Sequence, residues 1–149
     1  MLPAQSHRYW VAAALLLAAA SSAAAAEVGR VKVSKGPVFV ERGGERMPAP
    51  VDTALEPADV LVTGANASVG VTFTDNTRLA AGPNTVLAIN RYAFDQTTHA
   101  GTFDATVKRG TLGVVSGRMA KQSPEAVTLR TPSMVMGVRG TEFLVFAGD

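Results

Sequence analysis

Hydrophobic and polar residues alternate with a period of two in the clearest segments of this chain. Residues 68–74, with the sequence Ser-Val-Gly-Val-Thr-Phe-Thr, are the best case, and residues 102–108 repeat the pattern around Phe103. Successive side chains of a β-strand point to opposite faces of the sheet. Each segment is therefore predicted to be a strand with one buried and one solvated face.

Shorter apolar or alternating segments extend this pattern along the chain. They are residues 28–33, 38–40, 59–63, 77–81, 85–90 and 111–115. Most of them end at Gly, Pro, Asn or Asp, residues that favour turns. Residues 91–101 and 117–124 are expected to be loops, and no segment after residue 26 has convincing helical periodicity. The sequence predicts an all-β domain.

Dipeptides and tripeptides of turn-forming residues indicate how the strands are connected. The Gly-Pro pair at 36–37 is predicted to close a short hairpin, because proline cannot occupy a central strand. Asp75-Asn76 suits a tight hairpin, since both residues tolerate a positive φ. Residues 82–84 are expected to form the next corner, and Arg109-Gly110 is expected to turn one strand into another.

The first 26 residues have the features of a secretory signal peptide. His7 and Arg8 precede an apolar run at 9–20, and small residues end at Ala26 just before Glu27. The alternative is an uncleaved anchor, because the apolar run is almost long enough to span a bilayer. Its Ala-rich second half, interrupted by Ser, favours cleavage after Ala26. We expect an exported protein, periplasmic or secreted.

Composition narrows the possible functions. The chain has no cysteine, so it has neither disulfides nor a lipid-modified Cys at the end of the leader. Residues 27–149 are long enough for one domain with its own core. Of the 14 Lys and Arg only Arg8 lies in the leader, so 13 basic residues face 12 acidic ones after it. The basic residues are scattered, which does not indicate nucleic-acid binding.

The sequence gives no support for catalysis. His99 is the only histidine after the leader, and the Gly-x-Ser-x-Gly motif of serine hydrolases is missing. A single histidine cannot make a typical zinc site unless several carboxylates converge on it. Asp75 and Asp104 fall in a turn and on a polar strand face, with no indication that they face each other across a cleft. We therefore expect no enzyme activity, no metal and no cofactor.

An aromatic pair offers one candidate binding site. Arg91, Tyr92 and Phe94 lie close together, and both rings would point to the same side of an extended segment. Aromatic faces pack well against sugars and apolar peptide groups, so the three residues could form a ligand rim. The alternative, which we favour, is a loop folded over the sheet with both rings buried.

The run at residues 131–146 reads as a strand, a tight corner and a second strand. Gly137-Val138 and Gly140-Thr141 flank the single charge of Arg139. The apolar residues on both sides are expected to form buried strands. A guanidinium between such strands must be solvated or fully hydrogen-bonded, because an unpaired buried charge is very costly. We expect Arg139 to brace the corner, and the alternative is an exposed Arg139 that holds an anionic ligand.

This run and several earlier ones resemble the FecR domain, the periplasmic module of ferric-citrate-type regulators and of many stand-alone envelope proteins. The matching segments, in the order the family shows, are residues 29–31, 36–38, 59–64, 71–79, 83–85, 109–112 and 137–143. The resemblance implies a twisted, folded-over pair of antiparallel β-sheets, solenoid-like in section. It also implies a non-enzymatic envelope interaction or sensing module, linked to cell-surface signalling.

The chain departs from the family's regulators at both ends. Only about eight residues precede the apolar run, which leaves no room for a cytoplasmic segment that controls a sigma factor. The chain ends at Asp149, without the hairpin that in many members pairs with the last strand. We therefore expect either a truncated chain or an open edge at residues 142–146, from Glu142 to Phe146, that pairs with a partner strand. The partner would be an envelope protein, or in the alternative a cell-wall polysaccharide.

Overall fold

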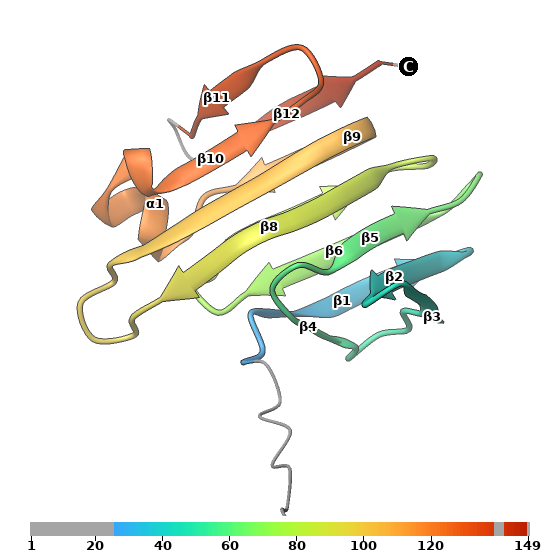
Figure 1. Cartoon of the computed structure of the whole chain (residues 1–149), viewed down its shortest axis with the longest axis horizontal. Helices are drawn as coiled ribbons and strands as arrows, with labels where there is room; N and C mark the ends of the chain where they lie inside the picture. Colours follow the sequence, from blue (N-terminus) through green and yellow to red (C-terminus); the bar gives the residue numbers. More distant parts are fainter. Residues whose placement is uncertain (1–25, 139–141, 149) are drawn as a thin grey trace, which may run out of the picture.

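Among the described residues, twelve strands form one hydrogen-bonded sheet that folds over into two layers (Figure 1). The computed structural model describes residues 26–138 and 142–148. The strands are β1 (Gly29–Lys35), β2 (Val38–Arg42), β3 (Glu45–Pro48), β4 (Ala54–Leu55), β5 (Val60–Thr63), β6 (Ser68–Phe73), β7 (Arg78–Ala81), β8 (Val86–Phe94), β9 (Gly101–Val115), β10 (Val127–Arg130), β11 (Val135–Gly137) and β12 (Glu142–Ala147). The all-β prediction is confirmed.

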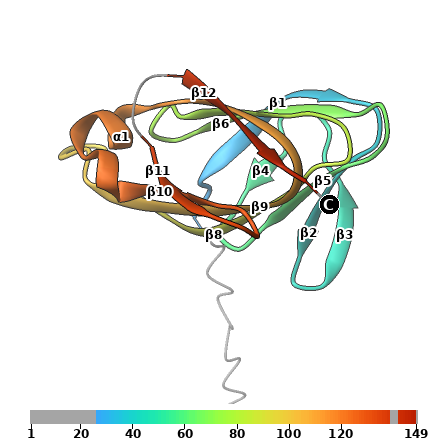
Figure 2. The same ribbon diagram turned by 90° about the horizontal axis from the view of Figure 1, so that it is seen from above.

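The two layers share β9. The layer with the order β4-β1-β6-β7-β9-β12 is here called sheet I, and the layer with the order β3-β2-β5-β8-β9-β10-β11 is called sheet II. All neighbours are antiparallel except β9 and β10, which run parallel. The first part of β9 pairs with β8 and its last part pairs with β7. Seen from above, the layers face each other across a flattened interior (Figure 2).

Alternating apolar residues of both layers fill this interior. On β6, Val69, Val71 and Phe73 are at most 2% exposed, while the residues between them are half-buried. The rings of Phe73, Tyr92 and Phe103 meet between the layers, with centroids 4.9 to 5.3 Å apart. The faces predicted to be buried on β6 and on the first half of β9 are the buried faces.

The chain crosses between the layers at a column of corners along one side. The corners are Gly36-Pro37, Gly64, Gly82-Pro83-Asn84 and the bend of β9 at Gly110. They are linked to one another: the Gly64 amide donates to the Pro37 carbonyl (2.9 Å), and the Asn84 amide donates to the Gly64 carbonyl (3.1 Å). Each rung, meaning a strand of one layer joined through a corner to a strand of the other, therefore stacks on the next as in a solenoid, as the family resemblance implies.

Two predicted turns are wrong for the same reason. Gly36-Pro37 does not close a hairpin, because β1 pairs with β4 and β6 while β2 pairs with β3 and β5. Arg109-Gly110 does not reverse the chain either, because β9 continues through it from sheet II into sheet I. Gly110 has φ +98, which bends the strand. A corner between layers and a hairpin use the same residue types, so composition alone does not separate them.

Two predicted loops also contain regular structure. β8 continues to Phe94 because it pairs with β9 as far as Gly101, which leaves a loop of only 95–100. Residues 117–124 contain a short helix, α1 (Arg118–Gln122), and a 3₁₀ turn, η1 (Pro124–Ala126), begins at the last of them. In the part of the chain that the structure describes, no helix is long and apolar enough to cross a membrane.

The strands around the closing corner are edge strands and are not fully buried. Among the described strands, β11 pairs only with β10, and β12 pairs only with β9. Val135 on β11 is 62% exposed, and Leu144 on β12 is 67% exposed. The expectation of buried strands on both sides of Arg139 is therefore wrong. Their apolar side chains lie on the last strand of each layer, where no further described strand covers them.

Replacement of Gly110 should test the column of corners. A Cβ at Gly110 would overlap the backbone and side chain of Thr85, whereas a Cβ at Gly43, in the β2–β3 turn, has no atom within 4 Å. Both glycines have a positive φ, so Gly43→Ala controls for backbone strain of about 1–2 kcal/mol. We expect Gly110→Ala to lower the free energy of unfolding by about 1–3 kcal/mol more than Gly43→Ala does, measured by urea denaturation. Equal losses would show that the corner is not closely packed.

Candidate functional site

The outer face of sheet I has a strip of small residues across its middle strands. Gly70 on β6 lies opposite Ala80 on β7, and Ala80 lies opposite Gly113 on β9. The same row continues to Val33 on β1 and to Leu144 on β12. Val33 is 46% exposed and Leu144 is 67% exposed. The small residues form the floor of a groove, and the two larger apolar side chains form its walls.

Val33 reaches this face because of a β-bulge at Lys32. The register between β1 and β6 shifts between Val31, which lies opposite Val71, and Val33, which lies opposite Gly70. The sequence alternation places Val31 and Val33 on one face, but Val31 is fully buried and Val33 is exposed. An extra residue in one strand of an antiparallel pair reverses the direction of the side chains that follow.

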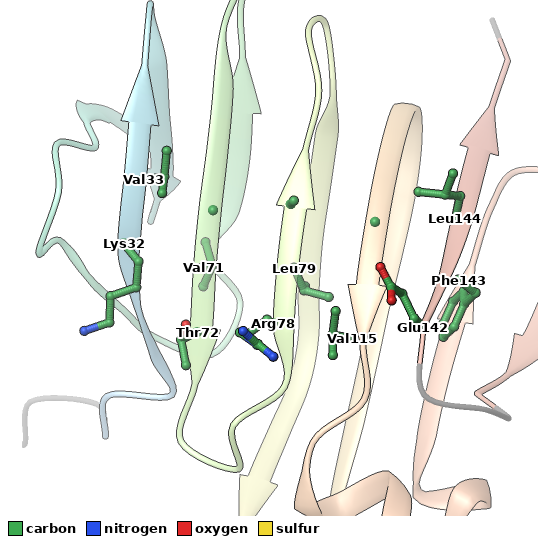
Figure 3. Close-up of a pocket in the computed structure, with 13 residues that line it drawn as sticks. Lys32, Val33, Val71, Thr72, Arg78, Leu79, Val115, Glu142, Phe143 and Leu144 are labelled. Carbon is green, nitrogen blue, oxygen red and sulfur yellow. The ribbon is translucent and has the colours of Figure 1, made fainter.

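The groove has a volume of about 630 Å³ and is charged at one end (Figure 3). Thr72, Arg78, Val115 and Glu142 form a row next to the floor, in register across β6, β7, β9 and β12. Arg78 and Glu142 lie on either side of Val115 and are exposed. No ion pair among the described residues involves Arg78 or Glu142. The groove therefore combines an apolar centre with charges of both signs, from Arg78 and Glu142 and also from Lys32 on β1.

β12 adds a free edge to this face. It pairs with β9 on one side, and on the other side it has no neighbour among the described strands. Leu144 and Phe146, which is 71% exposed, point outward from it, while Val145 and Ala147 are buried. An apolar strand with an unpaired edge is a template for pairing with another strand. Such an edge binds extended segments of other chains.

The residues of the predicted aromatic rim do not share one surface. Tyr92 is only 9% exposed and packs between the layers, while Arg91 is exposed. Phe94 is partly buried against the core and stacks on His99, with ring centroids 5.9 Å apart. Tyr92 is a core residue in this arrangement, because its hydroxyl hydrogen-bonds buried polar groups of the β6–β7 turn.

Asp75 is the centre of these buried polar groups. Its carboxylate is fully buried and accepts hydrogen bonds from the Thr77 hydroxyl (2.7 Å) and amide, the Tyr92 hydroxyl (3.0 Å) and the Met119 amide (3.3 Å). Burial raises the pKa of Tyr92, which keeps its hydroxyl protonated as a donor. The Asp75 carboxylate joins the β6–β7 turn to β8 and to the start of α1. All of these donors come from the chain itself, so the arrangement is structural.

Only part of the family motif lies within the described residues. Gly137 ends β11, and Val138 is 2% exposed with its amide donating to the Val127 carbonyl (3.3 Å). Arg139, Gly140 and Thr141 lie outside the described residues. The bracing role of Arg139 stays a prediction.

The acidic residues considered from the sequence do not converge with His99 on a metal-binding cluster among the residues that the structure describes. No cluster of three or more His, Asp or Glu side chains there has the geometry to hold a metal ion. Asp104 lies on the outer face of sheet II and accepts hydrogen bonds from Arg130 and Asn90. The bond from Arg130 lowers the pKa of Asp104, as expected for a paired surface carboxylate.

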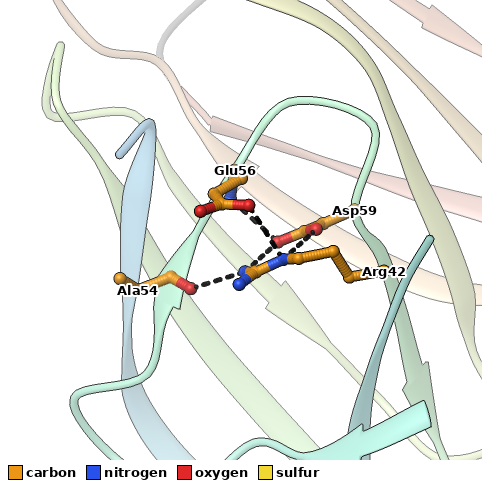
Figure 4. Close-up of polar contacts among 4 residues, drawn as sticks. All are labelled: Arg42, Ala54, Glu56 and Asp59. Carbon is orange, nitrogen blue, oxygen red and sulfur yellow. Dashed lines mark hydrogen bonds and ion pairs between the residues drawn. The ribbon is translucent and has the colours of Figure 1, made fainter. Parts of the chain in front are cut away.

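A second charged cluster consists of Arg42, Glu56 and Asp59, whose charged groups contact one another (Figure 4). Asp59 is buried, and both of its oxygens accept hydrogen bonds from Arg42 (2.8 and 2.7 Å). Arg42 also donates to the Ala54 carbonyl and contacts Glu56 at 3.1 Å. The hydrogen bonds to Asp59 raise the pKa of Arg42. This cluster ties β2, β4 and the start of β5 together, which is a structural role.

Removal of Arg42 should therefore destabilise the fold. Arg42→Ala leaves the buried Asp59 without its cation, so we expect a loss of about 3 kcal/mol, the low end for a broken buried pair because the Arg42 side chain is 33% exposed. Arg46→Ala is the matched control, since Arg46 forms a pair with Glu41 that is exposed on both sides. It should cost at most about 1 kcal/mol. Chemical denaturation of both variants tests this, and equal losses would contradict the structural role.

The groove on sheet I was not found from the sequence. Gly70, Ala80 and Gly113 stand on polar faces of segments predicted as strands, so their outward direction was predictable. Their alignment across three strands depends on the register, and β7 and β9 are far apart in the sequence. A signal was present in the repeated small residues at outward positions, but pairing was needed to interpret it.

One comparison with known proteins identifies a family. The family model described as FecR protein matches residues 59–149. These residues contain the strands from β5 to β12, including the floor of the groove and the free edge. The searches of curated proteins and of solved structures found no match. Since the family model covers more than half of the sequence, the chain belongs to the FecR family.

Proposed function

We propose that this protein is an exported, non-enzymatic FecR domain that binds a protein of the cell envelope and serves as an interaction or sensing module. The observation that carries the proposal is the free edge of β12, with Leu144 and Phe146 exposed beside an apolar groove. The FecR family and the signal-peptide-like residues 1–26 support export and a role in cell-surface signalling.

Binding is expected to occur by strand addition at residues 142–146. An extended segment of the partner would form backbone hydrogen bonds with β12, which supply affinity without regard to sequence. Its alternate side chains would extend the rows of the outer face of sheet I. The partner residue beside Leu144 is therefore expected to be apolar, so that both side chains lose contact with water on binding.

The alternative is a carbohydrate ligand, and the experiment must distinguish it from a protein partner. Sugar-binding surfaces use exposed aromatic rings. In the predicted aromatic rim, Tyr92 is buried and Phe94 is stacked on His99. We therefore favour a protein partner over peptidoglycan or another polysaccharide.

Affinity capture from an envelope extract should test the proposal. The full chain is expressed so that the cell processes its leader, with an affinity tag inserted at Gly43-Gly44 in the β2–β3 turn, remote from β12 in the sheet order. Captured proteins and glycan fragments are both identified by mass spectrometry. We expect one or a few envelope proteins to bind the wild type, and a Leu144→Lys/Phe146→Lys variant to lose them, because charges on the face of β12 oppose apolar contacts.

Val51→Lys is the matched control for this experiment. Val51 is 52% exposed and lies in the loop between β3 and β4, so the substitution also replaces an exposed apolar residue by lysine. It should leave capture unchanged. Capture of the same proteins by wild type and the β12 variant would contradict the role of β12. Enrichment of glycan fragments without protein would support the carbohydrate alternative instead.

A further inference from the structure

The outer faces of β7, β9 and β12 carry a pattern that is complementary to itself. Each row contains a small or cationic residue on β7 or directly after its end, then a residue on β9, and then a large or anionic residue on β12. The first row is Arg78, Val115 and Glu142, the second is Ala80, Gly113 and Leu144, and the third is Gly82, Thr111 and Phe146. All nine residues are exposed or half-buried.

A twofold axis along β9 would bring the members of each row together. Rotation by 180° about an axis parallel to β9, just above its outer face, places β12 of a second copy over β7 of the first and keeps each row at its own height. Leu144 of the second copy would then lie over Ala80, and Phe146 of the second copy over Gly82. Large side chains facing small ones fill the space between two stacked sheets, which pack about 10 Å apart.

The charges fit the same symmetry. In the first row the rotation places Glu142 of the second copy over Arg78, and Arg78 of the second copy over Glu142. Both residues are exposed, and neither forms an ion pair with another described residue. Val115 would face its own copy on the axis, between the two ion pairs. The charges therefore favour this rotation, whereas stacking of Arg78 over Arg78 would be repulsive.

We propose that the occupant of this face is a second copy of the chain, packed face to face across a twofold axis along β9. The interface is isologous, since the same three strands contribute on both sides. It covers Leu144 and Phe146, the two most exposed large apolar side chains among the described residues. It leaves the backbone edge of β12 free for strand addition. Because the dimer covers Leu144 and Phe146, which the capture experiment replaces, the dimer is tested with substitutions at other positions.

The size of the patch predicts a weak dimer. Three strands about 4.8 Å apart and three rows about 6.8 Å apart cover roughly 300 Å² on each copy. Standard interfaces bury about 800 Å² on each partner, so this dimer is expected to form only at high protein concentration. The measurement must therefore extend to about 1 mM, where even a complex of millimolar Kd is half formed.

Sedimentation velocity over a range of concentrations tests the proposal. The wild type is expected to pass from monomer to dimer. Arg78→Glu alone and Glu142→Arg alone should each weaken the dimer at least tenfold, because each places like charges opposite each other at both ends of the first row. The double variant Arg78→Glu/Glu142→Arg should dimerise like the wild type. Lys35→Glu, outside the three strands, should have no effect.

Cross-linking tests the position of the twofold axis, which the affinity of the dimer does not report. The chain has no cysteine, so a single Val115→Cys substitution creates one reactive site on each copy. A short bis-maleimide should link two copies through Val115→Cys and not through the control Thr72→Cys, which lies in the same row on β6. A wild type that remains monomeric up to about 1 mM, or a dimer that survives Arg78→Glu, would overturn the proposal. Neither result depends on whether a partner binds the edge of β12.

Discussion

The rest of this structure depends on the hydrogen-bonded column of corners that lets the chain change layers. A chain that leaves one sheet must satisfy its backbone groups at the corner, because unpaired buried groups are costly. Here each corner bonds the next one: Gly64 to Pro37, Asn84 to Gly64, and Gly82 to Thr111. The Thr63 hydroxyl adds a bond to the Gly82 carbonyl (2.6 Å). The corners therefore hold the two layers in a common register.

This register creates both the groove and its free edge. Since the rungs stack in order, outward residues of β1, β6, β7, β9 and β12 line up in rows although they come from distant parts of the chain. Small residues at three of these positions lower the middle of the face. At the end of the stack β12 has β9 on one side only. The surface that we propose for binding follows from this stacking of the strands. The buried Asp59 and Asp75 stabilise the ends of β5 and β6 that lie away from the corners.

Much of the fold could be predicted from the sequence, since strands and turns are local. The strict alternation at residues 68–74 sets which side of β6 is buried, because successive side chains must point to opposite faces. The same argument failed at Val33, where a bulge at Lys32 changes the face. It also failed at Gly36-Pro37 and at Gly110, because a corner between layers and a hairpin have the same local chemistry. Residues 118–122 are too few for a helical period to be recognised.

The sequence by itself determined that this is an all-β protein of the FecR family and that it has no cysteine chemistry. Strand alternation, family motifs and composition are properties of the chain alone. Only the tertiary structure decided that Tyr92 is a core residue bound to Asp75, and that Gly70, Ala80 and Gly113 form one floor. The physical reason is that pairing partners and register are set by contacts between residues far apart in the sequence. A surface made of several strands exists only once those contacts have formed.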